Sequence, residues 1–488
     1  MSPPVGPACG RSSPMKKKRT YQASRVQQVH VAELLPLLVA GCIVAIDVAK
    51  QRFVVALATM AGEVVKLFRF DHPTETRDFV RVVEELRAGV GSDKVMAAME
   101  PTGTYGDALR FQLAGAGVPV HMVSPKRTHD SQELFDGVRS LHDPKSAVLV
   151  AKVCSMGLST PWSAPPATRL RLRALVDLRQ HARAHEEMSF GRLEGVLARH
   201  WPEFGQWMDV REQQSALHLL TAYPSPARVA QESKAVAALL RKASRGKLSE
   251  QALAGVVEGA RKTTGVPMVL EEEQMVRTLV LELLAAGRSA DELDGQMRAL
   301  AKDDEVFARL SSWMGVYTAA VVVTRADPRQ YTSARQLEKA CGLNLREKSS
   351  GEKSGRLTIT KRGPGIVRQV LYLFALRMLQ DSAVVRAWYK RRRGHTEDSK
   401  QRAVVAVMRK LVRALFHIAR GNAFDASMLF DVRRLDLGTP TVATPAPTTA
   451  ASTTPTVMTK PMAPARTTPR PIARGRKRAR SSSAPTLA

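Results

Sequence analysis

The sequence predicts an α/β plus all-α protein, and three observations support this fold class. Strand-like and helix-like segments alternate over residues 40–165. They give way over residues 168–300 to apolar residues at helical spacing, and residues 306–431 are again largely helical. With 488 residues, of which 44% are hydrophobic, the chain can build two or three folded domains.

Alternating strands and helices define the first domain. Short apolar runs rich in β-branched residues favour strands, whereas a 3.6-residue apolar period favours helices, so the elements can be assigned in order. Thr74 is the expected N-cap of the first of these helices. The expected elements are the strands Cys42–Ala49, Arg52–Thr59 and Glu63–Phe70, the helix Thr74–Leu86, the strand Lys94–Met99, the helix Tyr105–Gly115 and the strand Val118–Val123.

The remaining regions are helical or lack a core-forming pattern. The long helical stretch Leu270–Met297 fits an antiparallel coiled coil and, equally, a plain helical bundle. A Gly-, Ser- and Lys-rich loop interrupts the last helical region at Ser349–Gly365. The expected domains are a basic extension 1–39, an α/β domain 40–165, a helical or coiled-coil spacer 166–303, a mainly helical C-terminal domain 304–435 and a disordered basic tail 436–488 rich in Pro and Thr.

Basic residues dominate the charge of the chain. The formal net charge is +29, and residues 41–438 carry +16 of it once both ends are set aside. A folded body this basic indicates a polyanionic partner, and nucleic acid is the usual one. On composition alone, a basic protein that is merely soluble remains the alternative.

Cysteine spacing and hydropathy bear on the compartment. The four cysteines lie far apart and form no Cys-x-x-Cys pair, so neither a disulfide framework nor a thiolate zinc site is indicated. The longest apolar run, Leu34–Ile46, is shorter than the roughly 20 residues of a membrane helix. No apolar segment follows the basic run Lys16–Arg19, as it would in a signal peptide. We therefore expect a cytoplasmic, nucleoid-associated protein without a membrane partner.

Acidic residues follow two apolar strands of the first domain. Asp47 closes one strand, and Glu100 closes another. If these strands are neighbours, their carboxylates converge at one sheet edge, where Mg²⁺ can bridge them and a phosphate. Asp143 follows at the start of an apparent helix. The alternative is structural, with ordinary strand-end acids at positions 47 and 100 and a helix N-cap at position 143.

Several motifs resemble one transposase family. Ile-Asp-Val-Ala-Lys, Met-Glu-Pro-Thr-Gly-Thr-Tyr, Val-Ser-Pro-Lys-Arg and His-Asp-Pro-Lys-Ser-Ala resemble the N-terminal DEDD domain of the insertion sequence one-ten family of bacterial transposases. Ser333–Leu337, Gly342-Leu343, Ser349-Ser350-Gly351 and Ile359–Gly363 are similar to its C-terminal domain. The resemblance covers about half of the chain. It implies an RNase H-like (RuvC-like) domain, a coiled-coil spacer and a C-terminal domain with a nucleophilic serine.

The acids of the family's metal site carry over residue by residue, with one departure. Asp47, Glu100 and Asp143 match the first three acids, whereas the fourth position holds Ser146. A serine hydroxyl is a neutral and weaker Mg²⁺ ligand than a carboxylate, so this site is expected to hold the metal less tightly. Asp136 and Asp130 are nearby acids that could take the fourth place.

The family's nucleophile corresponds to Ser350. A serine hydroxyl needs activation and cations that neutralise the phosphate it attacks. Gly351 and Gly355 permit a close backbone approach to a phosphate. On chemistry alone, the same loop fits a flexible phosphate contact, and Gly363-Pro364 stands where the family has Gly-Asn. The expected nucleic-acid-binding residues are Arg346, Lys348, Lys353, Arg356, Lys361 and Arg362.

These observations lead to one expected function and two alternatives. We expect a Mg²⁺-dependent DNA transposase or site-specific recombinase whose Ser350 forms a phosphoserine link to DNA. The resemblance further implies a structured noncoding guide RNA and a homo-oligomer, a dimer or tetramer. The alternatives are an RNase H-like junction nuclease whose serine loop only binds, and a degenerate, non-catalytic nucleic-acid-binding remnant, which Ser146 suggests.

Overall fold

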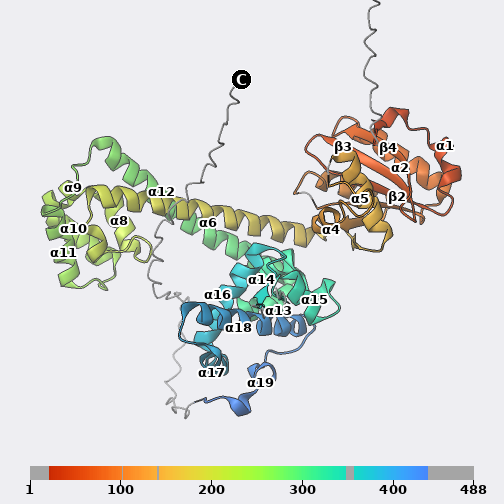
Figure 1. Cartoon of the computed structure of the whole chain (residues 1–488). Coiled ribbons are helices and arrows are strands. Elements are labelled where there is room, and N and C mark those ends of the chain that lie inside the picture. The colour runs from red at the N-terminus through yellow and green to blue at the C-terminus, as the bar shows by residue number, and fades with distance from the viewer. Residues whose placement is uncertain (1–20, 102, 140–141, 348–354, 356, 438–488) are drawn as a thin grey trace, which may run out of the picture. The chain divides into compact units, whose positions relative to one another are not determined.

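The computed structural model describes residues 21–101, 103–139, 142–347, 355 and 357–437 (Figure 1). The N-terminal α/β domain is built on one sheet in the order β1-β4-β3-β2-β5-β6-β7. Its strands are β1 (Ser24–Arg25), β2 (Cys42–Asp47), β3 (Arg52–Thr59), β4 (Val64–Asp71), β5 (Val95–Met99), β6 (Val120–Val123) and β7 (Ser159–Trp162). Strands β2, β3 and β4 pair antiparallel, whereas β2, β5 and β6 run parallel. The strands expected from the sequence are confirmed.

Helices cover both faces of this sheet. On one face, α2 (Thr76–Val90) and α3 (Asp107–Gly115) share a core with Val44, Ile46 and other residues at every second position of β2 and β3. On the other, α5 (Asp143–Ser155) packs on the intervening positions, such as Ile43 and Ala45. Because both faces are buried, the central strands are continuous apolar runs rather than alternating ones.

Two helix starts differ from the expectations. The N-cap of α2 is Glu75, and Thr74 instead donates its hydroxyl hydrogen bond to the Asp71 carbonyl at 3.3 Å. In α5 the cap is His142, whose ring nitrogen accepts from the Lys145 backbone N–H, so Asp143 is the first helical residue and not the cap. Asp143 therefore does not cap the helix, and helix capping does not explain a carboxylate at this position.

The α/β domain begins earlier than residue 40. Strand β1 pairs in parallel with β4, and α1 (Val31–Leu34) follows it. Val26, Leu34 and Leu38 are buried in the same core as α2. Residues 24–38 thus differ from the basic extension expected over 1–39, because their apolar side chains complete one face of the sheet.

The spacer is formed by two long helices, α6 (Ala167–His200) and α12 (Leu270–Leu300), which pack against each other along their length (Figure 1). Arg179 Nε lies 3.4 Å from Asp294 Oδ1, Ser189 Oγ donates to Glu282 at 2.8 Å, and His200 Nε2 lies 3.3 Å from Glu272 Oε1. Early residues of α6 therefore meet late residues of α12, and the pair is antiparallel.

A small helical bundle caps the spacer at the end of α6 and the start of α12. Its core surrounds Trp201 and Phe204 and includes Leu193 and Val276. Each of the two predicted arrangements, an antiparallel coiled coil and a helical bundle, is therefore confirmed in part. The spacer is an antiparallel helix pair with a helical bundle at one end. The helices of the bundle are α7 (Phe204–Trp207), α8 (Gln214–Ala222), α9 (Pro226–Gln231), α10 (Ser233–Ala243) and α11 (Glu250–Arg261).

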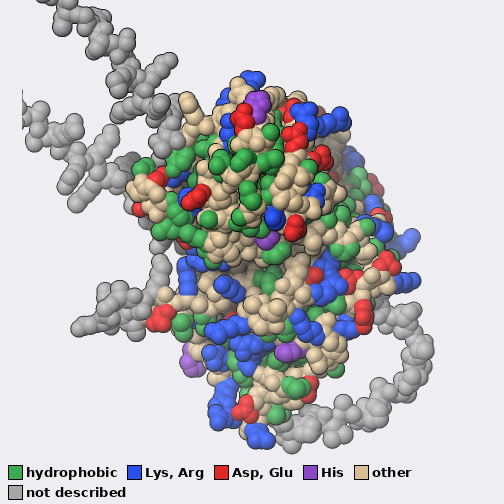
Figure 2. Space-filling view, turned by 90° about the vertical axis from the view of Figure 1, so that its right-hand side faces the viewer, with side chains coloured by type: hydrophobic (Ala, Val, Ile, Leu, Met, Phe, Trp, Pro, Cys, Tyr) green, Lys and Arg blue, Asp and Glu red, His purple; other side chains and the backbone are tan. Residues whose placement is uncertain are grey.

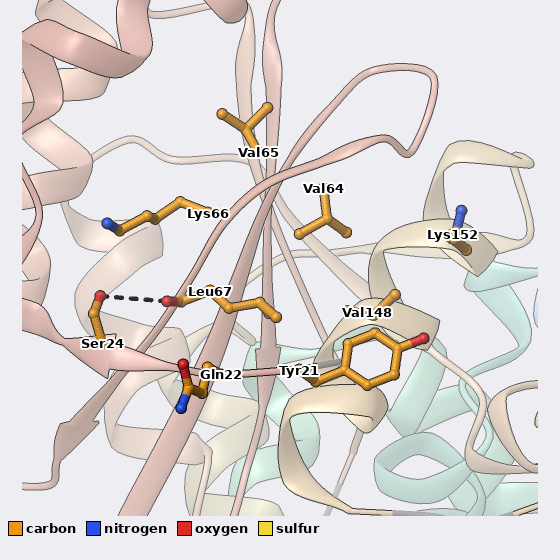
Figure 3. A pocket seen from close by; sticks show the side chains of 9 residues that line it. All are labelled: Tyr21, Gln22, Ser24, Val64, Val65, Lys66, Leu67, Val148 and Lys152. Atoms are coloured by element: carbon orange, nitrogen blue, oxygen red, sulfur yellow. Dashed lines mark hydrogen bonds between the residues drawn. The ribbon is translucent and has the colours of Figure 1, made fainter. Parts of the chain in front are cut away.

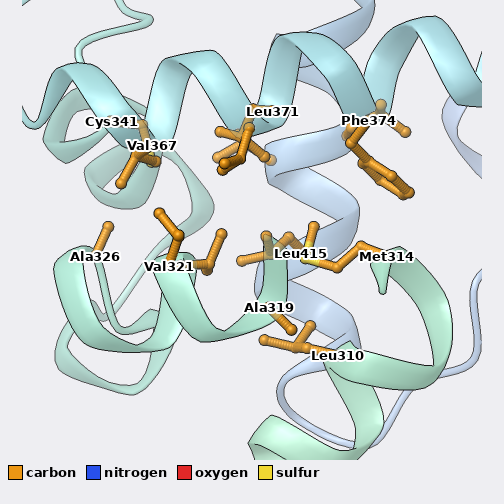
Figure 4. Close-up of a cluster of buried hydrophobic side chains, with 14 of the residues drawn as sticks. Leu310, Met314, Ala319, Val321, Ala326, Cys341, Val367, Leu371, Phe374 and Leu415 are labelled. Atoms are coloured by element: carbon orange, nitrogen blue, oxygen red, sulfur yellow. The ribbon is translucent and has the colours of Figure 1, made fainter. Parts of the chain in front are cut away.

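The C-terminal region is helical apart from one short hairpin, as expected. Figure 4 shows its core, where Leu310, Val321, Leu371, Phe374 and Leu415 meet. Across the part of the chain that the structure describes, no helix has the length and apolarity to cross a membrane. The elements are α13 (Glu305–Met314), α14 (Val316–Arg325), α15 (Ala334–Ala340), β8 (Leu345–Arg346), β9 (Thr358–Ile359), α16 (Gly365–Asp381), α17 (Ala383–Arg392), α18 (Glu397–Ile418) and α19 (Ala426–Leu429).

Candidate active site

Sheet register brings the first two acids together. Strands β2 and β5 are parallel neighbours, with Ile46 opposite Met99. Asp47 is the last residue of β2 and Glu100 directly follows β5, so the two acids lie side by side at the carboxyl ends of these strands. In open α/β sheets this edge is the usual position of a ligand site. Asp143 begins α5, which packs against β2.

The three carboxyl groups share one electrostatic field. Burial first, and then the charges of Asp143 and Glu100, together raise the pKa of Asp47 to about 7. Asp47 is half-buried, whereas Asp143 is exposed. Like charges that face a desolvated carboxyl disfavour its ionised form, and a bound cation reverses that preference. The site is therefore electrostatically suited to a cation.

The donor set fits a hard divalent metal ion, since carboxylate oxygens are the ligands that Mg²⁺ prefers. Within the described residues, however, no three His, Cys, Asp or Glu side chains are gathered into a group that could hold a metal ion. Glu100 instead accepts a hydrogen bond from the hydroxyl of Thr128, a buried residue of α4 (Pro125–Asp130). Sequence reasoning missed Thr128, whose only signal is its position directly after the Val-Ser-Pro-Lys-Arg motif.

Ser146 lies one helical turn after Asp143, and residues three apart share a helix face. It is half-buried, and its backbone N–H donates to the His142 carbonyl at 3.0 Å. The hydroxyl at position 146 is thus placed on the side of α5 that carries Asp143.

The two acids considered as substitutes for a fourth carboxylate are each engaged by a lysine. The buried Lys145 Nζ lies 2.8 Å from Asp136 Oδ1, and Lys126 Nζ lies 2.6 Å from Asp130 Oδ2. These hydrogen bonds lower the pKa of both carboxyls. Neither acid is among the charges that raise the pKa of Asp47. Each of these two carboxylates is therefore neutralised by a lysine.

Ser146→Asp is expected to tighten Mg²⁺ binding, because a carboxylate adds both charge and a hard oxygen donor. A fourth carboxylate also repels the other three when no metal is bound, so the metal-free protein should be slightly less stable. Thermal melts over a Mg²⁺ titration measure both effects against wild type. An unchanged dependence on Mg²⁺ would show that position 146 is not at the metal site.

Part of the expected serine loop lies outside the described residues, namely Ser350, Lys348, Lys353 and Arg356. The structure does describe the hairpin of β8 and β9 that flanks this loop. The three remaining cations, Arg346, Lys361 and Arg362, are exposed on or beside it. Figure 2 shows Lys and Arg side chains gathered over the C-terminal helices, in the lower part of that view.

Two glycines fix the foot of this hairpin. Gly342 has φ +71°, and a Cβ there would lie 2.6 Å from the Arg362 carbonyl oxygen. Gly363 has φ +137°, and its Cβ would lie 2.1 Å from the Ala340 carbonyl oxygen. Arg368 Nη1 donates to the Gly363 carbonyl at 2.9 Å. The hairpin is therefore held against the end of α15 by backbone contacts that only glycine permits.

A separate hollow of about 590 Å³ lies along β4 and α5 (Figure 3). Tyr21, Lys66, Val148 and Lys152 line it, and Ser24 Oγ donates to the Leu67 carbonyl at 3.3 Å. None of the expected site residues lines this hollow. It is therefore distinct from the candidate active site.

Comparisons with known proteins match two segments of the chain. A family model described as a transposase, of the DEDD type of IS110 elements, matches residues 44–202. A second, described as the transposase IS116/IS110/IS902 family, matches residues 309–390. A curated relative, the transposase for insertion sequence element IS1111A of Coxiella burnetii, is 31% identical over 139 residues. This match spans 26% of the chain and 38% of the relative's length.

The matched ranges coincide with the two sites described above. Residues 44–202 contain Asp47, Glu100 and Asp143, and residues 309–390 contain the hairpin with Gly342 and Gly363. The acid cluster and the hairpin therefore lie in different matched regions, in the order in which the motifs occur along the chain.

Proposed function

The chain belongs to the IS110 family of transposases, and from this premise we propose that it cuts and rejoins DNA to move an insertion sequence. The observation that carries the proposal is the presence of both matched regions in order, with Asp47 and Glu100 of the first region at one sheet edge. The charge of +16 on residues 41–438 supports a nucleic-acid partner.

The proposed metal site belongs to an RNase H-like domain. The mixed sheet with helices on both faces supports this fold, and the parallel pairing of β2 with β5 supports the convergence of Asp47 and Glu100. We assign Asp47, Glu100 and Asp143 as Mg²⁺ ligands, with Ser146 at the fourth position. When bound there, the cation supplies positive charge beside a DNA phosphate. Asp47, Glu100 and Asp143 would hold the cation and would take no part in a covalent step.

Ser350 is the proposed nucleophile, and this assignment depends on the family match. Its Oγ attacks a DNA phosphorus, an Oγ–P bond forms, and the bond from phosphorus to the leaving sugar oxygen breaks. The hydroxyl proton ends on that sugar oxygen. Since the phosphoserine link preserves the energy of the broken bond, the reverse attack by a new sugar hydroxyl rejoins DNA without ATP. Arg346, Lys361 and Arg362 neutralise the phosphate during attack.

A structured noncoding RNA and a homo-oligomer complete the proposal. In this arrangement RNA pairing selects the DNA sites, and Ser350 of one subunit works beside the acids of another. The basic body of the chain supports binding of either nucleic acid, since each phosphate contact releases counterions whatever the sequence.

Capture of a covalent intermediate tests the proposal. The full-length protein is mixed with its guide RNA and with DNA of the element end that carries a nick, so that the cut strand cannot be rejoined. A protein–DNA adduct that is sensitive to protease should accumulate. Ser350→Ala should reduce both adduct and recombination to background while DNA affinity stays within about twofold, because the change removes the nucleophile and no cation. Ser349→Ala is the matched control and should retain activity.

The other outcomes identify the alternatives. Mg²⁺-dependent cleavage without an adduct would indicate a junction nuclease, and the absence of both cleavage and adduct would indicate a non-catalytic remnant. Recombination at the wild-type rate by Ser350→Ala would refute the assignment of the nucleophile.

A further inference from the structure

A basic cavity lies at the foot of the hairpin formed by β8 and β9. Its volume is about 850 Å³, and residues of α15, α18 and the start of β8 line it. Four of the lining residues are cationic and one is acidic: Arg335, Lys339, Arg409, Arg413 and Glu338. The wall therefore carries a formal charge of +3, which suits an anionic ligand.

Glu338, the one carboxylate among the cavity's lining residues, forms ion pairs with Arg409 and Arg413. The Glu338 side chain is only 4% exposed, and its Oε1 accepts from Arg409 Nε at 2.7 Å. Its Oε2 accepts from Arg413 Nε at 3.4 Å. A buried carboxylate is stable only when cations compensate it, so this contact keeps both guanidinium groups at the cavity wall.

Both guanidinium groups retain capacity for another acceptor. An arginine side chain has five N–H donors, and each of these two uses only its Nε–H on Glu338. In the described ranges of the chain, no further acceptor contacts the Nη groups of Arg409 or Arg413. Paired Nη donors match the oxygens of a phosphate, and prior fixation of the side chains lowers the entropy cost of binding one.

Hydrogen bonds connect the cavity wall to the hairpin of β8 and β9. Asn344 and Leu345 line the cavity, and Leu345 is the first residue of β8. Thr360, which directly follows β9, donates its hydroxyl to Asn344 Oδ1 at 2.5 Å and its backbone N–H to the Asn344 carbonyl at 2.9 Å. An anion in the cavity would thus lie at the base of the hairpin of β8 and β9.

We propose that this cavity binds a backbone phosphate of the DNA strand on which the protein acts. Arg335, Lys339, Arg409 and Arg413 contact the phosphate, and Glu338 is a positioning residue that orients two of them. That this strand is one the protein cuts and rejoins rests on the proposed function, whereas the binding of a DNA phosphate by the cavity does not.

Salt-dependent DNA binding tests the cavity. The probe is a fluorescein-labelled 40-bp duplex, titrated with the full-length protein from about 50 to 300 mM KCl. Arg413→Gln and Arg335→Gln should each weaken binding about five- to tenfold at low salt and reduce the salt slope by about one, since each removes one phosphate contact. Arg335 has no ion pair with Glu338, so its removal leaves the buried carboxylate compensated.

Arg402→Gln is the matched control, because Arg402 lies on the same helix α18 but does not line the cavity. It should change the affinity by less than about twofold. Equal losses from Arg402→Gln and Arg413→Gln would overturn the proposal, because a general charge effect would then explain both. Unchanged binding by Arg335→Gln and Arg413→Gln would overturn it as well.

Glu338→Gln separates positioning from simple charge. The change adds one positive charge to the cavity, so electrostatics alone predicts tighter DNA binding. If Glu338 orients the two arginines, binding should instead weaken about threefold or more, in protein whose circular dichroism spectrum matches wild type. Tighter binding by Glu338→Gln would overturn the positioning role.

The adduct assay distinguishes failure of this proposal from failure of the proposed function. An adduct in wild type, with DNA binding insensitive to Arg335→Gln and Arg413→Gln, would refute the cavity and leave the function standing. Weakened binding by both variants, with no adduct in wild type, would support the cavity as a DNA-phosphate site and refute the function.

Discussion

Replacement of Asp47 by Asn is expected to abolish Mg²⁺-dependent strand cleavage and to stabilise the metal-free protein at pH 8. The amide keeps the shape of the side chain but is a neutral and weaker metal ligand, so cleavage should fall at least 100-fold. Stability should rise because Asn removes a charge that burial and two neighbouring carboxylates disfavour.

The sign of the pH dependence follows from the pKa of Asp47. Because this pKa is raised from 3.8 to about 7, the folded state binds the proton more tightly than the unfolded state. Its contribution to stability is therefore present below about pH 4 and is lost as the pH rises to about 7. The full shift would correspond to about 4 kcal/mol, and solvent screening of a half-buried group reduces the expected change to about 1–2 kcal/mol.

Thermal and urea unfolding of the α/β domain, in EDTA at pH 4 and pH 8, measures the effect. Asp47→Asn should unfold like wild type at pH 4 and at higher temperature than wild type at pH 8. Asp130→Asn is the control, because that exposed carboxylate pairs with Lys126 and does not face Asp47. If Asp47→Asn retains Mg²⁺-dependent cleavage, Asp47 is structural.

Gly363→Ala is expected to disrupt the foot of the hairpin and to abolish recombination. The new methyl group would lie 2.1 Å from the Ala340 carbonyl oxygen, which is backbone and cannot rotate away, and φ +137° is strained for any side chain. A loss of at least about 3 kcal/mol from the stability of the C-terminal region should result, since steric overlap adds to backbone strain.

Gly365→Ala provides a matched control two residues away. It lies at the start of α16, and the nearest atom to its added methyl group would be a flexible Arg368 Nη2 at 3.8 Å. The stability of this variant should equal that of wild type or be slightly higher, because alanine has a higher helix propensity than glycine. Urea unfolding and limited proteolysis of both variants provide the comparison. Equal stability of Gly363→Ala and wild type would contradict the close backbone contact.

Sequence by itself determined the strands β2 to β6 and the helices α2 and α3 of the α/β domain, and which acids end two of the strands. Continuous apolar runs such as Cys42–Asp47 identify strands buried on both faces, since period and burial are local properties. The same reasoning placed Asp47 and Glu100 at strand ends. It could only assume that these strands are neighbours, whereas the register of Ile46 with Met99 establishes it.

Only the tertiary structure decided which distant segments meet. Nothing local in Ser24–Arg25 specifies a pairing with β4, and the helical period of α6 and α12 fits an antiparallel pair as well as a bundle. From the sequence, Glu338 is indistinguishable from a surface acid on a short helix. Its burial is explained only by its contact with Arg409, which lies 71 residues later in the chain. The physical reason is that periodicity encodes how much of a segment is buried, whereas the choice of partner depends on side-chain packing and charge complementarity across the whole fold.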